Sequence, residues 1–261
     1  MTLVKHELKQ GRISFLIWTA SIGFLILVCI CMFPEMEGQM DGVNEMFASM
    51  GSFTAAFGMD RLNFGTLIGF YAIECGNILG LGGAFFASLC AAGILSKEER
   101  DKTAEFLLTH PVSRIRIITE KLIAIQIQIF VMNLIIYALA IASIAGVGEE
   151  IPWKEISLLH LAHYLMQVEL SGICFGISSF LRKGSAGVGL GIAAMMYFLN
   201  LIANITESAE FLKYITPFGY CEGADIIGNG RLDAGMLAVG IALGAAGIAA
   251  AYVKYAKKDI R

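Results

Sequence analysis

Charged residues are scarce in this sequence, and long stretches contain none. Asp, Glu, Lys and Arg make up 16% of the 261 residues, whereas they make up roughly 25% of ordinary soluble domains. Hydrophobic residues reach 57%, and the mean hydropathy is +0.70. This composition excludes an ordinary soluble domain and indicates a protein whose solvent is largely lipid.

Motifs that would give the chain chemistry of its own are also missing. A phosphate-binding loop needs a glycine-rich stretch that ends in Lys followed by Ser or Thr. Lys102 and Thr103 are the only such pair, and no glycine precedes them at the required spacing. The six cysteines form no CxxC motif. We therefore expect no ATPase site, catalytic residue, disulfide or metal site in this chain, and nothing in the charge pattern supports nucleic-acid binding.

Six apolar segments are long enough, or nearly so, to cross a bilayer as helices. A hydrocarbon core of roughly 30 Å needs about 20 apolar residues for each helical crossing. The segment at 158–181 is the least apolar, because it contains Glu169 and two histidines. The segments lie at about 13–33, 66–95, 117–146, 158–181, 184–205 and 234–255. We therefore expect an all-α, polytopic membrane helix bundle that forms one transmembrane domain over residues 1–261.

The basic residues orient this bundle, because Lys and Arg beside membrane spans accumulate on the cytoplasmic side. If the N-terminus lies inside, 15 of the 19 basic residues fall on the inner side. The basic residues that remain outside are Arg61, Lys154, Lys213 and Arg231. The opposite orientation would reverse this bias. Both termini are therefore expected in the cytoplasm, with the protein in the cell (cytoplasmic) membrane.

Two inner segments have helical patterns of their own. Residues 1–12 place Leu3, Val4 and Leu8 at helical spacing among charged neighbours, which predicts a short amphipathic helix on the inner membrane surface. Residues 96–116 form the most charged stretch, in which Pro111 should end one short helix and Ser113 should cap the next. The chain thus places a structured cytoplasmic loop between spans two and three.

Glycine pairs spaced four apart recur in the apolar segments, where small residues let helix backbones approach closely. The pairs are Gly65/Gly69, Gly76/Gly80, Gly172/Gly176, Gly187/Gly191 and Gly240/Gly244. Packing inside the bundle and contact with a second chain would both explain them, and spacing alone does not decide between the two.

Proteolysis and metal binding are two alternatives to simple packing for the polar residues within the spans. An intramembrane serine protease would need Ser178 or Ser185 beside His160 or His163, yet about 22 Å of helix separates His163 from Ser178. His160, His163 and Gln167 share a helix face and could bind a metal. The alternative is a histidine pair that lies at the membrane interface and binds no metal. Proteolysis and metal binding are thus both disfavoured.

Glu169 is the most informative isolated residue, because its position places it about 20 Å from the inner face. A charge at that depth costs several kcal/mol unless it faces the bundle interior or a wet cavity, or is protonated. Gln128, about 16 Å deep in the third span, is a candidate partner. Glu169 could serve structural hydrogen bonding, or it could line a translocation path.

The cytoplasmic loop carries a recognisable pattern. The stretch EERDKTAEFLLTHPVSRIRIITEKL resembles the loop after the second span in the permeases of type-2 ATP-binding cassette (ABC) transporters. The matching residues are Glu99, Thr103, Glu105, Pro111, Val112, Ser113, Arg114 and Lys121, whereas Ala104 and His110 depart from the commonest forms. The early Glu7, the ITPFGY stretch at 215–220 and the ending YAKKDIR extend the resemblance over the whole chain.

The resemblance implies the transmembrane subunit of an ATP-driven exporter that is not itself catalytic. Such a permease pairs with a second permease chain, identical or related, and docks on two separate ABC ATPase subunits, which bind the ATP and Mg. Its loop helix would transmit the movement of the ATPase. The residues that would carry this coupling are Glu98, Glu99, Thr103, Glu105, Phe106, His110, Pro111 and Arg114, while Glu169 and Gln128 would belong to the translocation path or to buried polar contacts.

Two other functions fit the same composition. A secondary transporter would move its substrate with an ion gradient and no ATPase, and a noncatalytic scaffold or immunity protein would show no flux. Nothing in the sequence identifies the substrate.

Overall fold

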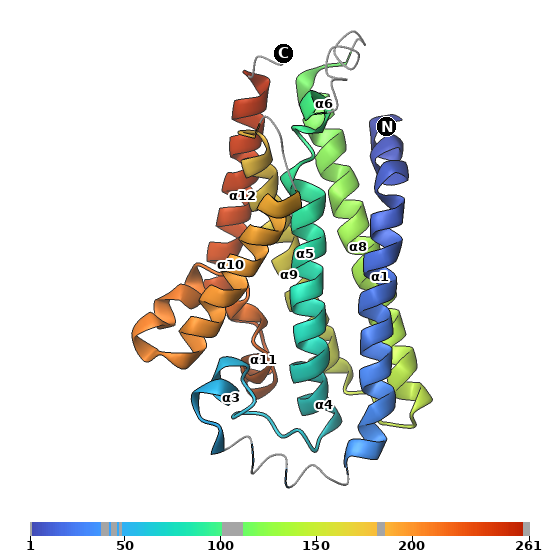
Figure 1. Ribbon diagram of the computed structural model, residues 1–261, viewed down its shortest axis with the longest axis vertical. Coiled ribbons are helices and arrows are strands. Elements are labelled where there is room, and N and C mark those ends of the chain that lie inside the picture. The colour runs from blue at the N-terminus through green and yellow to red at the C-terminus, as the bar shows by residue number, and fades with distance from the viewer. Residues whose placement is uncertain are drawn as a thin grey trace.

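The computed structural model describes residues 2–37, 42, 46, 49–100, 112–181 and 186–257. Throughout this part of the chain every regular element is a helix, which confirms the expected all-α bundle. Figure 1 shows long helices running side by side, with α10 leaning away from the rest. The long helices are α1 (Thr2–Glu37), the composite helix Leu67–Ala92, α8 (Arg114–Gly146), α9 (Trp153–Ser178), α10 (Ala186–Ile205) and α12 (Ala234–Ala256).

Five of these helices are long and apolar enough to cross a membrane, and α9 is the sixth long helix. Its polar side chains lower its hydropathy, as the sequence indicated. Its 26 residues nevertheless span about 39 Å at 1.5 Å per residue, which exceeds the roughly 30 Å hydrocarbon core. Its length is therefore sufficient for the sixth crossing that the sequence predicts, although α9 is not among the five helices that qualify by both length and hydropathy.

Both ends of the described chain lie at one end of the bundle. In Figure 1 the start of α1, the end of α12 and the short helix α6 (Lys97–Arg100) all lie at the top. We call this the inner end, because the basic residues gather there. The short helices α3 (Ser52–Ala56) and α11 (Gly223–Asn229) lie near the opposite, outer end.

The N-terminal segment is helical, but it is not a separate helix on the membrane surface. It continues directly into the first span as the single 36-residue helix α1. Buried residues explain this continuity, because Val4, Ile22, Ile26 and Ile30 recur along one face at multiples of the helical turn. The packing face of the span thus extends to the first turn, and α1 packs against α8 along its length.

The second span contains a local distortion. Thr66 caps its start by accepting a hydrogen bond from the Gly69 amide at 3.2 Å. The helix then runs through α4 (Leu67–Phe70), one turn of π-helix at Tyr71–Cys75, and α5 (Gly76–Ala92). A π turn inserts one extra residue and is frequent at functional sites. It lies here beside the polar face of α9.

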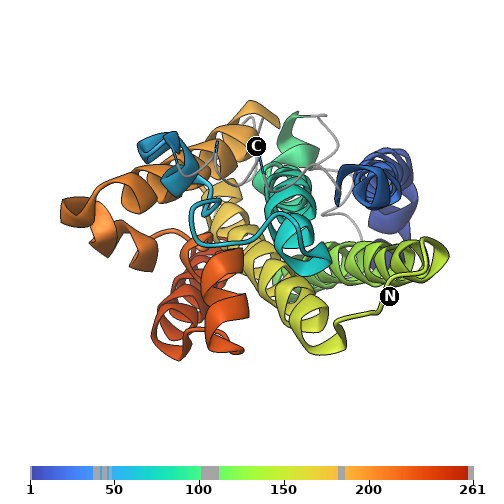
Figure 2. The ribbon, with the colours of Figure 1, turned by 90° about the horizontal axis from the view of Figure 1, so that it is seen from below.

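Helix α9 occupies the centre of the bundle. Figure 2 shows it, in yellow, between α12, α5 and α8, and it packs against all three. Glycines make the contact with α12 close: a Cβ on Gly172 would lie 2.7 Å from the Gly244 carbonyl oxygen, and one on Gly176 would lie 2.6 Å from that of Gly247. The pairs Gly172/Gly176 and Gly240/Gly244 therefore serve packing within the chain.

The outer segment between α10 and α12 folds into short helical pieces. They are η2 (Glu207–Tyr214), η3 (Gly219–Cys221) and α11, separated near the proline and glycines that the sequence marks as breakers. Helix α12 then begins where Asp233 accepts a hydrogen bond from the Met236 amide at 2.8 Å. This segment returns to the bundle, because η3 and α11 both pack on α9.

Candidate functional site

Four charged side chains meet at the inner end, where α1, α6 and α8 come together. We call Glu7, Lys97, Glu98 and Lys121 the inner cluster. The Lys121 side chain is fully buried, and its ammonium donates hydrogen bonds to the Ile94 carbonyl and to Glu98 Oε1, both at 2.5 Å. The Lys121 Nζ also lies 3.6 Å from Glu7 Oε1, while the Lys97 Nζ lies 3.1 Å from Glu7 Oε2.

The inner cluster links three segments at the start of the loop between the second span and α8. An ammonium removed from water is costly unless it is paired and hydrogen-bonded. Lys121 has two hydrogen-bond acceptors, one from the end of the second span and one from α6, and it forms an ion pair with Glu7 of α1. These contacts link α6 to α1 and to the start of α8.

A second contact fixes the first turn of α1. The Glu120 Oε2 accepts hydrogen bonds from the amides of Leu3 at 3.0 Å and Val4 at 3.3 Å. Its Oε1 accepts from Arg116 Nε at 2.8 Å, one turn away on α8. Because the first amides of a helix have no partner within the helix, a carboxylate there both satisfies them and favours the positive end of the helix dipole. Helix α8 thus caps α1.

The expected coupling residues are described only in part. Glu98 belongs to the inner cluster, and Glu99 lies half-buried on α6. Arg114 is the first residue of α8, as the capping position of Ser113 predicted, and it donates to the Ala256 carbonyl at the end of α12 at 3.4 Å. The other five lie outside the described residues: Thr103, Glu105, Phe106, His110 and Pro111.

Glu169 is buried inside the bundle, as its depth in the sequence predicted, and is only 4% exposed. Its Oε2 accepts a hydrogen bond from the Tyr220 hydroxyl at 2.9 Å, which brings the outer segment onto α9. Among the residues that the structure describes, its Oε1 has no hydrogen-bond partner. Gly240 makes room for this carboxylate, since a Cβ there would lie 2.1 Å from Oε2.

Gln128 does not partner Glu169. Its amide nitrogen donates to the Ala124 carbonyl of its own helix at 3.4 Å, and its side chain is 8% exposed. The amide oxygen faces α1, where a Cβ on Gly11 would lie 2.7 Å away. Gln128 therefore borders α1, whereas Glu169 belongs to the contact between α9 and the outer segment.

Polar side chains run along the face of α9 that meets α5 and α8. His160 Nε2 lies 2.6 Å from the Tyr71 hydroxyl of the π turn, and His163 Nδ1 lies 2.7 Å from the Leu159 carbonyl. One turn further, Gln167 Oε1 accepts from Asn133 Nδ2 at 2.7 Å. Both histidines are buried in the bundle and contact neighbouring polar groups.

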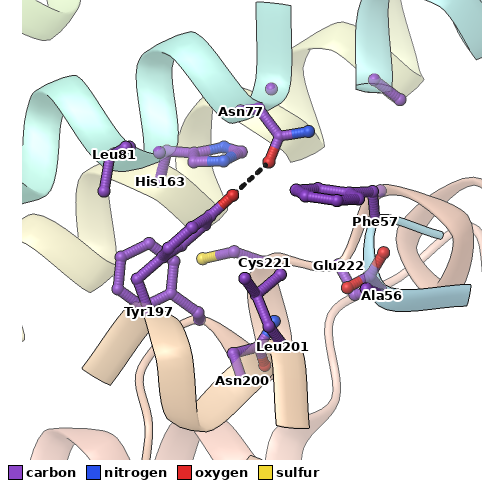
Figure 3. Close-up of a pocket in the computed structure, with 15 residues that line it drawn as sticks. Ala56, Phe57, Asn77, Leu81, His163, Tyr197, Asn200, Leu201, Cys221 and Glu222 are labelled. Carbon is purple, nitrogen blue, oxygen red and sulfur yellow. Dashed lines mark hydrogen bonds between the residues drawn. The ribbon is translucent and has the colours of Figure 1, made fainter. Parts of the chain in front are cut away.

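A small polar pocket lies at the outer end between the second span, α10 and the outer segment. Figure 3 shows Asn77, His163, Tyr197 and Asn200 around it, with the Tyr197 hydroxyl donating to Asn77 Oδ1 at 3.4 Å. Its volume of about 50 Å³ has room for roughly three waters. The pocket is too small for a drug-sized ligand.

Glu222 lies at the edge of this pocket and holds two outer segments together. Its Oε2 accepts from Asn204 Nδ2 at 2.9 Å, and its Oε1 lies 3.8 Å from Arg61. Burial raises the pKa of this carboxyl above its usual range, and the Asn204 hydrogen bond and the Arg61 charge oppose that rise only partly. The Glu222 carboxylate therefore joins Arg61 and Asn204, which are distant in sequence, although burial disfavours its ionised form.

The sequence pointed to several of these residues, but it did not indicate which residues they contact. Glu7 and Lys121 stood out only through the family resemblance, and Tyr220 only as part of the ITPFGY stretch. The signal available was chemical: a lysine at the inner edge of an apolar run needs a carboxylate nearby. Which carboxylate it meets depends on contacts between α1 and α8, and no local pattern specifies them.

Comparison with known proteins identifies a family for the chain. Residues 1–260 match a family described as ABC-2 family transporter protein, which covers essentially the whole chain. No curated protein matches it.

Proposed function

Because the chain belongs to the ABC-2 family of transporter proteins, and is thus a multi-pass membrane transport subunit, we propose that it is the permease of an ATP-driven exporter in the cell membrane. Membrane subunits of this family work with ABC ATPase partners and are typically noncatalytic. In our proposal two ATPase subunits bind the ATP and Mg, and a second permease chain completes the path.

The inner cluster is the observation that best supports coupling to an ATPase. A partner that pushes on the cytoplasmic loop would act on α6, which carries Glu98. The buried contact of Glu98 with Lys121 would pass that movement to α8, and Glu7 would pass it to α1. Packed elements and buried ion pairs of this kind transmit displacement because they have few alternative arrangements.

The residues of the loop itself would contact the ATPase. We assign that role to Glu98, Glu99, Thr103, Glu105, Phe106, His110, Pro111 and Arg114. Glu169 and Gln128 would serve the translocation path from the polar interior of the bundle. Glu169→Gln keeps an acceptor for the Tyr220 hydroxyl. If transport and its pH dependence are unchanged in this variant, Glu169 does not belong to the translocation path.

Co-purification with an ATPase tests the proposal directly. The chain is expressed together with a candidate ABC ATPase, purified through a tag on the chain, and assayed for bound ATPase and for ATP hydrolysis. We expect the double variant Glu105→Ala, Phe106→Ala to insert in the membrane but to retain about tenfold less ATPase, the effect of losing roughly 1.4 kcal/mol at a contact.

The matched control changes two acidic residues at the opposite end, Glu149→Ala and Glu150→Ala, which should leave ATPase recovery unchanged. Equal recovery of ATPase with both double variants would contradict docking through the loop. Substrate flux driven by an ion gradient in the absence of any ATPase would instead favour a secondary transporter, and the absence of all flux would favour a scaffold.

A further inference from the structure

Two cysteine thiols meet between α1 and the second span. Cys29 lies on α1, and Cys75 is the last residue of the π turn. Both are free thiols, and their side chains are hydrogen-bonded to each other. They come from distant parts of the sequence and form no CxxC motif, so no local pattern indicates this contact.

Helix α1 and the second span run antiparallel, and their contacts define a register. Phe33 packs on Phe70, with the ring centroids 5.4 Å apart. Further toward the inner end, a Cβ on Gly82 would lie 3.0 Å from Ile22 Cγ1. The residue number on the second span therefore falls as the number on α1 rises.

This register places the two thiols opposite each other. Along α1, Cys29 lies one turn from Phe33. Along the second span, Cys75 lies one π turn from Phe70. Each cysteine is also eight residues from the outer end of its long helix, or about 12 Å at 1.5 Å per residue. The contact thus follows from the packing of the two helices.

The two thiols differ in access. Cys75 is fully buried, whereas Cys29 is half-buried. A reagent therefore meets Cys29 first, and Cys75 already lies against the sulfur that reacts. An accessible thiol beside a second, resolving thiol is the usual arrangement of redox-sensitive cysteines. Their depth along the spans excludes a bulky protein oxidant and favours a small apolar one.

We propose that Cys29 and Cys75 form a thiol–disulfide exchange site for a small, apolar disulfide that enters from the outer half of the membrane. The Cys29 sulfur gives up its proton and attacks one sulfur of the reagent, whose S–S bond breaks. A mixed disulfide forms on Cys29, and half of the reagent leaves as a thiol that carries the proton.

Cys75 completes the exchange. Its sulfur gives up its proton and attacks the Cys29 sulfur of the mixed disulfide, so the second half of the reagent also leaves as a thiol. The two cysteines are oxidised to one disulfide, and the reagent is reduced to two thiols that carry both hydrogens. The exchange requires neither an ATPase nor transport, so it is independent of the proposed function.

The resulting bridge would join α1 to the π turn. Tyr71 of the same turn lies 2.6 Å from His160 Nε2, so the bridge would connect the first helix to the central helix α9. It would also close a loop over residues 30–74, which restricts the unfolded chain. The midpoint of thermal unfolding should therefore rise by about 5 °C or more on oxidation and return on reduction.

The reaction of 2,2′-dipyridyl disulfide with the purified chain in phosphatidylcholine nanodiscs tests the proposal. Release of pyridine-2-thione is followed by its absorbance, and unreduced tryptic peptides are then read by mass spectrometry. The test chain carries Cys31→Ser and Cys90→Ser. In that chain peptide 13–61 contains only Cys29, and peptide 62–97 contains only Cys75.

The test chain should release about two thiones, as one exchange requires, and its two peptides should be joined with the loss of two hydrogens. Reduction should separate them. Adding Cys75→Ser should stop the reaction at the mixed disulfide, with one thione released and one pyridylthio group on Cys29. Adding Cys29→Ser should leave Cys75 unreacted, because it is buried.

A positional control keeps Cys31, which is exposed on α1, and replaces Cys29 and Cys90 by Ser. Cys31 should react and remain a mixed disulfide, because it does not face Cys75. Bridging of Cys31 to Cys75 as fast as that of Cys29 would overturn the proposal, since the register would not matter. A mixed disulfide that persists on Cys29 beside a free Cys75, or a Cys29 that does not react, would overturn it as well.

Discussion

Lys121 carries a positive charge at a position from which water is excluded, and its two hydrogen-bond acceptors and its ion-pair partner Glu7 come from three different segments. The side chain therefore acts as a tether as much as an ion pair. Removing one member of such a buried group leaves the other charges without compensation, which costs more than the pair contributes when it is intact.

We expect Lys121→Met to lower the free energy of unfolding by about 3 kcal/mol, near the low end for a broken buried pair, because Lys97 still contacts Glu7. Unfolding in detergent micelles, followed by circular dichroism, measures the change. Lys257→Met, exposed at the same end, is the matched control and should change stability little. Equal stability of the two variants would show that Lys121 is not a tether.

Glu222 gives the outer segments a stability that depends on pH. Burial raises the pKa of its carboxyl in the folded state above that in the unfolded chain. The folded state therefore holds the proton more tightly, so this contribution is fully present below the unfolded pKa and is lost as pH rises through the raised folded pKa.

Glu222→Gln should remove that dependence. The amide keeps an acceptor for Asn204 but has no proton to lose. We therefore expect the midpoint of unfolding of the unchanged protein to fall, relative to that of the variant, as pH rises from 4 to 8. Asp225→Asn, at an exposed carboxylate 2.6 Å from the same Arg61, is the control. A constant difference between protein and variant across this range would contradict the burial of Glu222 as the cause.

At the scale of the helices, glycine decides how closely α9 and α12 approach. A Cβ on Gly247 would lie 2.5 Å from the Gly172 carbonyl oxygen and 2.9 Å from Ile173 Cα, both of which are backbone atoms that move only with the helix. On Gly191 of α10, by contrast, a Cβ would meet nothing within 4 Å. The same substitution should therefore have opposite effects at these two positions.

Gly247→Ala should destabilise the protein by about 1–3 kcal/mol, the usual cost of overpacking a close contact. Gly191→Ala should be neutral or should stabilise by up to about 1 kcal/mol, because alanine favours the helix. Denaturant titration in micelles compares them, with the change in midpoint as the measurement. A Gly247→Ala protein as stable as Gly191→Ala would mean that α9 and α12 are not in close contact.

The helices themselves were largely predictable, because membrane crossings need long apolar runs. The expected segment 234–255 corresponds to α12 at Ala234–Ala256, and 184–205 to α10 at Ala186–Ile205. The hydrogen bond between Tyr220 and Glu169 was not predictable, because 51 residues separate the two. Gln128 lies at a comparable depth and was therefore the expected partner of Glu169. Hydropathy gives the depth of a side chain, whereas the rotation of its helix decides which neighbour it meets.

The N-terminal segment shows the same limit. Its apolar residues at helical spacing among charged neighbours fit a helix on a membrane surface, yet the charged Glu7 is one of its buried residues. Its partners Lys97 and Lys121 lie 90 and 114 positions away, so the sequence pattern read locally assigns Glu7 to the solvated face. Burial of a charge becomes favourable only when the bundle supplies the opposite charges.

For the whole molecule, the distribution of charge predicts which end faces the cytoplasm. The start of α1, α6 and the end of α12 share one end (Figure 1), and most basic residues lie there. Lys and Arg beside spans are retained on the cytoplasmic side. The orientation therefore follows from the total number of Lys and Arg residues in all the segments at the inner end. No single helix has to determine it.

Cysteine labelling in intact cells measures this orientation. We expect a membrane-impermeant maleimide to label Asn229→Cys, at the end of α11, without permeabilisation, because that position lies at the outer end. Lys257→Cys, just after α12, should react only once the membrane is opened. The native Cys31 lies within α1 and serves as the background in both variants. The reverse pattern would place the inner cluster outside the cell, where no cytoplasmic ATPase could reach the loop.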